Sequence, residues 1–228
     1  MSYVALILSP IVWAMDQVLN LLHALVGNYG VAIIGLSIVV RVVMLPITNA
    51  AIRTEARDRE VQLAMQPALA DARTRLRGRD RFERIDEIYT EHSYHPVRAM
   101  VSLLPLFLQL PFLLSALVLL SDNSQLYGVP FLFIADLSRP DGLLPLALPG
   151  GTIAVNVLPI AITLVALVDA WAKKDMTGSM RVRFAIVAAV IAVLIYPLSA
   201  ALCLYWLTSN LFSFARTLIG RAGSSQEV

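Results

Sequence analysis

The fold is decided by the stretch Gly30-Val-Ala-Ile-Ile-Gly-Leu-Ser-Ile-Val-Val-Arg-Val-Val-Met-Leu-Pro-Ile-Thr48. As a helix it is long enough to cross a bilayer, and it carries Arg41 well inside its apolar run. The residues that follow Arg41 place it roughly 10 Å from the nearer end, at about 1.5 Å rise per residue. A charge in the middle of a lone membrane helix costs about 2.5–3.5 kcal/mol, so Arg41 needs a special environment.

Two polar residues accompany this arginine. Ser37 lies four residues before Arg41 and Thr48 seven after it, so the three side chains share one helix face. The other faces carry Val, Ile, Leu and Met. This pattern favours a water-filled cavity inside the membrane, because the other apolar segments offer almost no carboxylate to neutralise Arg41. The alternative is an arginine paired with a carboxylate in a dry helix bundle.

The overall composition agrees with a membrane protein. Hydrophobic residues make up 58% of the 228-residue chain, charged residues make up 15%, and the mean hydropathy is +0.72. These values lie far outside the usual composition of soluble domains and predict a polytopic membrane protein rather than a globular enzyme. The single cysteine, Cys203, lies in an apolar run, where we expect it to be a packing residue.

The apolar segments predict five membrane spans, at residues 29–48, 99–120, 152–171, 181–196 and 198–218. The preceding segment, 1–28, places Asp16 and His23 on one side and apolar residues on the other. This predicts an amphipathic helix in the membrane interface, with a sixth span as the alternative. The remaining segments are then a cytoplasmic helical hairpin at 49–98, an extracytoplasmic loop at 121–151, a cytoplasmic loop at 172–180 and a cytoplasmic tail at 219–228.

The expected hairpin is strongly charged, with ten arginines and nine acidic residues. Two thin apolar stripes at helical spacing predict two antiparallel helices, and Gly78 separates them. The stripe residues are Val61, Met65, Ala68, Leu69, Ala72 and Leu76, followed by Phe82, Ile85, Ile88 and Tyr89. The arginines are explained either by a solvated face that touches anionic lipid or by binding of ribosomal RNA or a nascent chain.

The basic residues also predict the orientation of the chain. Of the 18 Lys and Arg, all except Arg41 and Arg139 lie in the hairpin, the loop before the fourth span and its flank, or the C-terminal region. Because cytoplasmic loops are enriched in Lys and Arg, the N-terminus is expected outside and the C-terminus in the cytoplasm. An odd number of spans, five, likewise places the N-terminus and the C-terminus on opposite sides of the membrane.

Further polar residues lie inside the expected spans. Gln109 stands between Pro105 and Pro111 in the second span, where it could line a groove or bond to carbonyl groups freed by the prolines. The fifth span carries a polar patch on two adjacent faces, formed by Tyr205, Trp206, Ser209 and Asn210.

Several motifs, in this order and on these spans, resemble those of the YidC-type membrane protein insertases, from about residue 8 to residue 219. The motifs are Gly27-Asn-Tyr-Gly30, Val40-Arg41, Leu45-Pro-Ile-Thr48, Gln66-Pro67, Leu104-Pro-Leu-Phe-Leu-Gln-Leu-Pro-Phe112, Ala135-Asp-Leu-Ser-Arg-Pro-Asp141 and Leu204-Tyr-Trp-Leu-Thr-Ser-Asn210.

The resemblance implies an all-α fold of five spans around a hydrophilic groove that opens to the cytoplasm and the lipid. It implies an insertase or chaperone of the bacterial inner membrane, not an enzyme, that works without nucleotide hydrolysis, metal or other cofactor. The implied groove residues are Arg41, Ser37, Thr48, Gln109, Tyr205, Trp206, Ser209 and Asn210. The implied partners are nascent or newly made membrane proteins and the lipid bilayer. The ribosome, targeting factors or the Sec translocon are further candidates, and DNA is not expected.

Two other classes of protein fit the sequence less well. A transporter or channel usually places ionisable pairs or broken helices at the midplane, whereas Arg41 alone is deep here. An intramembrane enzyme needs a catalytic pair or a metal site, whereas the three histidines, His23, His92 and His95, lie outside the expected spans.

Overall fold

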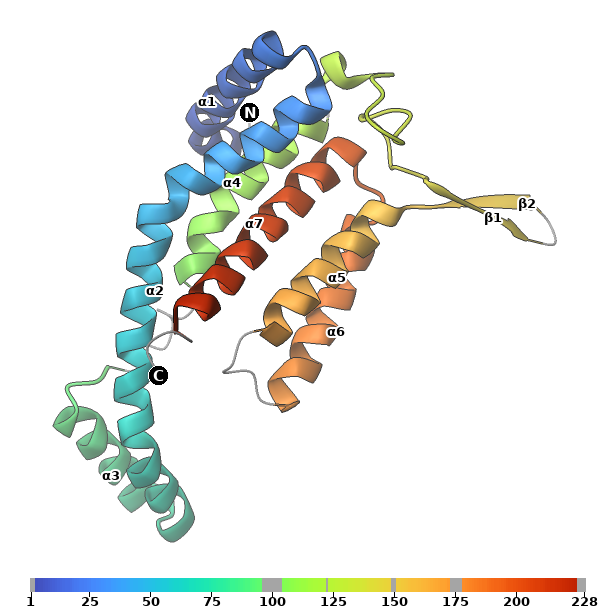
Figure 1. Cartoon of the computed structure of the whole chain (residues 1–228). Coiled ribbons are helices and arrows are strands. Elements are labelled where there is room, and N and C mark those ends of the chain that lie inside the picture. The colour runs from blue at the N-terminus through green and yellow to red at the C-terminus, as the bar shows by residue number, and fades with distance from the viewer. Residues whose placement is uncertain (1–2, 96–103, 122, 149–150, 173–177, 225–228) are drawn as a thin grey trace. The chain divides into compact units, whose positions relative to one another are not determined.

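The computed structural model describes residues 3–95, 104–121, 123–148, 151–172 and 178–224, and it is mainly helical (Figure 1). The helices are α1 (Tyr3–Val26), α2 (Tyr29–Arg75), α3 (Gly78–Glu91), α4 (Leu104–Ser121), α5 (Val157–Ala172), α6 (Gly178–Ile195) and α7 (Ala200–Ser224). Two strands, β1 (Leu144–Leu148) and β2 (Gly151–Val155), form an antiparallel hairpin in which Leu144 pairs with Val155. By its contacts the chain divides into two units, Met1–Val42 with Phe112–Val228, and Val43–Pro111.

Buried residues of the first unit lie on the first part of α2, on α4, on α5 and on the first turns of α7, and α5 packs against both α6 and α7. The first turns of α7 are sealed almost completely, with exposed fractions of 0 to 1% from Ala200 to Cys203. Ile33 and Leu36 of α2 are likewise fully buried. Small residues at the start of α7 allow close approach of the neighbouring backbones, as is common where helices pack inside a membrane.

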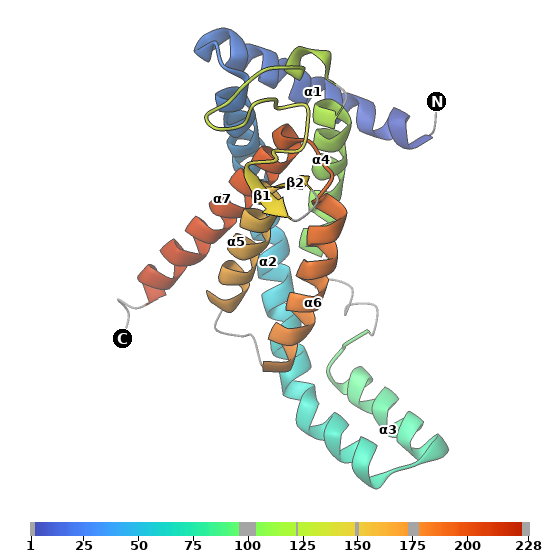
Figure 2. The ribbon, with the colours of Figure 1, turned by 90° about the vertical axis from the view of Figure 1, so that its right-hand side faces the viewer.

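Helix α1 lies across one end of the first unit, whereas α5 and α6 run lengthwise (Figure 2). It turns into α2 at Gly27, which has a φ of +70°, a conformation that glycine adopts without strain. The rings of His23 and Tyr29 stack across this turn, with their centroids 3.6 Å apart. Leu19 is fully buried whereas Leu25 is 73% exposed, so α1 packs on the unit by one face and leaves apolar side chains outside.

The second unit contains the charged segment, and its two apolar stripes pack together. Met65, Ala72 and Ile88 are buried with Tyr94, and Val61, Ala68, Leu69, Ile85 and Tyr89 pack around them. Phe82, which the helical spacing assigns to the second stripe, is instead 71% exposed. It lies in the first turns of α3 and is not among the residues that pack on this core.

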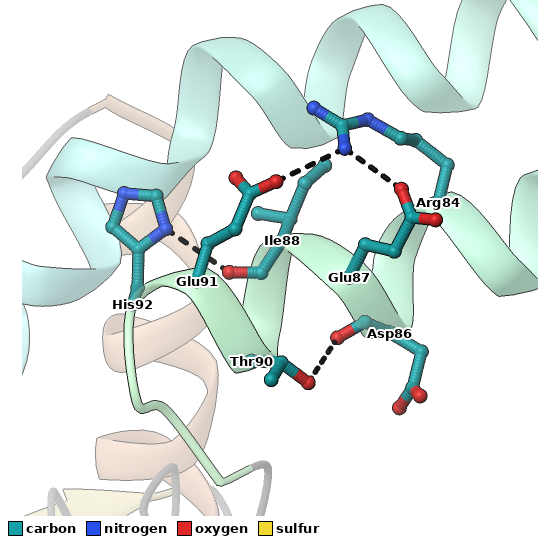
Figure 3. Close-up of polar contacts among 7 residues, drawn as sticks. All are labelled: Arg84, Asp86, Glu87, Ile88, Thr90, Glu91 and His92. Carbon is teal, nitrogen blue, oxygen red and sulfur yellow. Dashed lines mark hydrogen bonds and ion pairs between the residues drawn. The ribbon is translucent and has the colours of Figure 1, made fainter.

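Arginines of the second unit make local ion pairs with acidic residues one turn away. Arg75 pairs with Asp71, and Arg79 pairs with Glu83. Figure 3 shows a third case, in which Arg84 Nη1 donates to Glu87 at 2.8 Å and to Glu91 at 3.1 Å. These bonds favour the charged form and raise the pKa of Arg84, with the bond to Glu87 as the largest cause. Such pairs on the exposed surface of a helix stabilise it only weakly.

Two features differ from the sequence-based expectation. First, α2 does not stop near Thr48 but continues through Pro46 and Pro67 to Arg75. Both prolines are exposed, and buried side chains such as Met65 continue on the packed face of the helix. Second, β1 occupies the end of the segment expected to be an extracytoplasmic loop, β2 occupies the start of the expected third span, and α5 begins only at Val157.

Candidate functional site

Arg41 is held at the junction of α2 and α7 in the first unit. Its Nε donates a hydrogen bond of 2.7 Å to Ser209 Oγ, and the pair is partly buried. Within the part of the chain that the structure describes, no carboxylate forms an ion pair with Arg41. The guanidinium is therefore positioned by a neutral hydroxyl, and its charge is not cancelled by an acidic partner among these residues.

One turn earlier, a second hydroxyl joins the same two helices. Ser37 is fully buried, and its Oγ donates a hydrogen bond of 2.9 Å to the carbonyl oxygen of Tyr205. The spacing of four residues from Ser37 to Arg41 matches the spacing from Tyr205 to Ser209, so the two contacts form successive steps of one seam. The two hydrogen bonds of this seam fix the rotation of α2 against α7, and they thereby direct the side chain of Arg41 toward α7.

The polar patch of α7 surrounds this seam. Ser209 is 5% exposed and Tyr205 is 4% exposed, whereas Trp206 and Asn210 are half-buried. Arg216, about two turns beyond Ser209 on the same face, lies close enough to interact with the charge of Arg41. The structure thus brings together Arg41, Ser37, Tyr205 and Ser209, with Trp206 and Asn210 beside them. The two other expected groove residues, Thr48 and Gln109, belong to the second unit.

At one end of the first unit, the loop between α4 and α5 closes over the helix termini. Asp141 accepts hydrogen bonds from the backbone N–H groups of Val157 and Leu158, at 2.5 and 3.3 Å, and so caps the start of α5. Asn156 joins the same loop to the end of α6, because it accepts from Gly142 N–H and donates to the carbonyl oxygen of Tyr196. An acidic cap is favoured here by the unpaired N–H groups at the helix start.

The start of α7 is capped by the backbone of the same loop. Ala200 N–H donates to the carbonyl of Arg139 at 2.7 Å, and Ala201 N–H donates to that of Leu137 at 2.9 Å. Asp136 fixes the loop by accepting from the hydroxyl and the N–H of Ser138. The hydroxyl of Ser138 is the largest cause of a pKa lowered below the ordinary value for Asp136.

A further polar contact lies toward the other end of α5 and α7. Thr217 Oγ1 donates a hydrogen bond of 2.7 Å to Asp169 Oδ1, and Asp169 is only 9% exposed. Asp169 lies near the end of the expected third span, 152–171, and Thr217 lies near the end of the expected fifth span, 198–218. Because the partners are 48 residues apart, spacing along the chain could not have paired them.

Comparison with known proteins identifies the family. The model of the family described as "60Kd inner membrane protein" matches residues 21–226. The chain belongs to this family. The match includes Arg41, the seam to α7 and the capping loop.

The curated relatives that match are longer proteins named "Membrane protein insertase YidC". The protein of Neisseria meningitidis serogroup C, strain FAM18, is 30% identical over 213 residues, which are 91% of this chain and 35% of that protein. The protein of Janthinobacterium sp. is 25% identical over 221 residues, which are 94% of this chain and 37% of that protein. The chain therefore spans about a third of the length of these relatives.

A solved structure shares the fold. A crystal structure titled "Active YidC insertase crystal structure with the first transmembrane domain resolved" matches with a TM-score of 0.58 and 18% identity, over 95% of this chain and 47% of that chain. This confirms the expected resemblance and the mainly helical architecture. The five-span count and the groove remain predictions.

The side chains at the site are suited to binding polar groups. Among the described residues, there is no group of three or more His, Cys, Asp and Glu that could hold a metal ion. The side chains gathered around Arg41 are hydroxyls, an indole and an amide, which can bind polar groups and water. A guanidinium among such groups offers a site for a carboxylate or a main-chain carbonyl.

Proposed function

We propose that the chain is a membrane protein insertase of the inner membrane. It receives the hydrophilic segment of a client protein beside Arg41 and releases the client's apolar helix into lipid, without nucleotide hydrolysis. The observation that carries the proposal is Arg41 itself. It lies inside the apolar stretch of α2, the helix that is long and apolar enough to cross a membrane, and it is held by Ser209 rather than by a carboxylate.

The environment of Arg41 supports a hydrated groove. A charge without an acidic partner is tolerated inside a membrane when it faces water. The neighbouring side chains of Trp206 and Asn210 are half-buried, so that face of α7 is not sealed. An acidic residue of a client that reached 4 Å from the guanidinium would gain about 4 kcal/mol at an effective dielectric of 20. That gain offsets part of the cost of drawing a polar segment below the lipid surface.

The capping loop supports a groove that opens on one side. Asp141 and the backbone of the loop satisfy the starts of α5 and α7, so this end is closed by hydrogen-bonded protein. With the N-terminus outside, as the basic residues predict, the closed end faces outward and the groove faces the cytoplasm. The five-span topology, the interfacial position of α1, and contact with the ribosome, targeting factors or the Sec translocon belong to the same proposal.

The test is insertion of a client into proteoliposomes that contain the purified chain. Arg41→Ala should impair insertion of a client with an acidic leading segment, and Arg41→Lys should retain most of it. Neutralising the client's acidic residues should remove the difference between wild type and Arg41→Ala. Val42→Ala, on the 50%-exposed neighbour, is the matched control and should insert the client normally. Equal insertion by all variants would refute the electrostatic role, and no insertion by the wild type would refute the function.

A further inference from the structure

The extracytoplasmic loop contains a tight turn with an apolar tip. Phe131 and Ile134 exchange two backbone hydrogen bonds, from Phe131 N–H to Ile134 O at 2.9 Å and from Ile134 N–H to Phe131 O at 2.8 Å. Leu132 and Phe133 are therefore the two residues of a hairpin loop. Phe131 is 8% exposed and Ile134 is 3% exposed, so the base of the turn is fixed in the core of the first unit.

The tip itself is exposed and strained. Leu132 is 78% exposed and Phe133 is 71% exposed, among the highest values for the large apolar residues described. Leu132 also has a φ of +50°, a conformation in which two-residue hairpin loops prefer glycine or asparagine. A leucine at this position is unfavourable both for the backbone and, in water, for the side chain. The strain marks the tip as a functional site, and the exposure of two large apolar side chains indicates that it does not face water.

The turn is tied to the point where α2 begins. A β-carbon at Gly30 would overlap the ring of Phe131, so the two residues are in close contact. Gly30 is the second residue of α2 and the first of its long apolar stretch. If α2 crosses the bilayer from there, Gly30 lies at the boundary between headgroups and hydrocarbon. Leu132 and Phe133, directly next to Phe131, then lie at the same depth.

The surroundings of the turn are also apolar. Tyr127, on the same loop, is 60% exposed, and an exposed tyrosine is typical of a membrane interface. The end of α1, which leads into α2 beside Gly30, exposes Leu25 and Val26 by 73% and 51%. Exposed apolar side chains therefore lie both on this loop and at the end of α1.

We propose that Leu132 and Phe133 are a lipid anchor, inserted among the acyl chains just below the headgroups of the leaflet on this side. The partner is the bilayer itself, because neither side chain is charged and both lie at the depth of its interface. The anchor holds the capping loop at a fixed height on the membrane. This inference depends on α2 crossing the bilayer and not on the insertase activity, so the two fail separately.

The test uses a fluorophore attached to single cysteines in lipid nanodiscs, with Cys203→Ala as the background. Leu132→Cys and Phe133→Cys are compared with Arg139→Cys, whose native side chain is 81% exposed on the same loop. We expect quenching by lipids with a nitroxide near the headgroup to be at least about twofold stronger for the labels at Leu132 and Phe133 than for the label at Arg139. Aqueous iodide should show the reverse order. Equal quenching of all three labels, or iodide quenching at the tip, would overturn the proposal.

A second variant tests the anchor without disturbing the core. Leu132→Gly relieves the positive φ, so thermal stability in detergent should be unchanged or higher, whereas nitroxide quenching of a label at Phe133 should fall. Unchanged quenching would show that the lipid contact of the tip does not depend on Leu132, and it would overturn the role proposed for this residue. Labels shielded from both nitroxide lipid and iodide would mean that protein covers the tip, which would also overturn the proposal.

Discussion

Replacing Ser209 by alanine tests whether water reaches Arg41. The hydrogen bond from Arg41 Nε to Ser209 Oγ is 2.7 Å long. A hydrogen bond to a charged group contributes about 1.5–3 kcal/mol when nothing replaces the lost partner. In a hydrated groove, a water molecule takes the place of the hydroxyl, and the loss falls to about 0.5 kcal/mol, the usual size of a surface change. The loss in the free energy of unfolding of Ser209→Ala therefore shows whether water reaches Arg41.

Ser37→Ala is the matched control, because Ser37 joins the same helices one turn away. It is fully buried, and its bond to the carbonyl of Tyr205 is between neutral groups, which contributes about 0.5–1.5 kcal/mol. If Arg41 is hydrated, Ser37→Ala should therefore lower the free energy of unfolding by at least as much as Ser209→Ala. This is the reverse of the order expected from the bonds alone, because the bond to Ser209 involves a charged group. The free energy of unfolding would be measured in mixed micelles by tryptophan fluorescence. A Ser209→Ala loss exceeding the Ser37→Ala loss by about 1.5 kcal/mol would mean that Arg41 is dry, and the reasoning would be refuted.

Three further predictions concern the loop. Gly30→Ala should lower the free energy of unfolding by about 1–3 kcal/mol, because the added methyl group displaces the ring of Phe131; thermal unfolding in detergent would show it, and unchanged stability would contradict the close contact. Asp141→Ala should cost about 1–2 kcal/mol by removing the cap of α5, with partial recovery in Asp141→Asn; equal losses in the two variants would argue against a hydrogen-bonded cap. Because the pKa of Asp136 is lowered in the folded state, its contribution to stability is complete above its ordinary pKa of about 4 and is lost as the pH falls through the lower folded value. Ser138→Ala should raise the pKa of Asp136 in an NMR titration and move the acid unfolding transition to higher pH.

Local patterns in the sequence were enough to anticipate much of the architecture. Helical spacing selected Met65, Ala72 and Ile88 as one packed surface, and the structure buries all three. The four-residue step from Ser37 to Arg41 likewise placed them on one face, and both turn toward α7. Such predictions succeed because each depends on neighbours within two helical turns.

Contacts between distant segments could not be anticipated in the same way. The cap of α5 comes from Asp141, 16 residues before Val157, and no local rule selects an acceptor at that separation. The strands at 144–148 and 151–155 were missed because a short apolar run fits a strand or the start of a membrane helix equally well. Phe82 was misassigned because periodicity alone does not show which residues of a stripe are covered by the other helix.

The loop that caps α5 and α7 has a mechanical consequence. Because this loop holds the starts of α5 and α7 together, the two helices can separate only from their other ends. Toward those other ends, Thr217 donates its hydrogen bond to Asp169, so this bond must break before α5 and α7 can move apart there. Any separation of these two helices would therefore begin at those ends and decrease toward the capping loop.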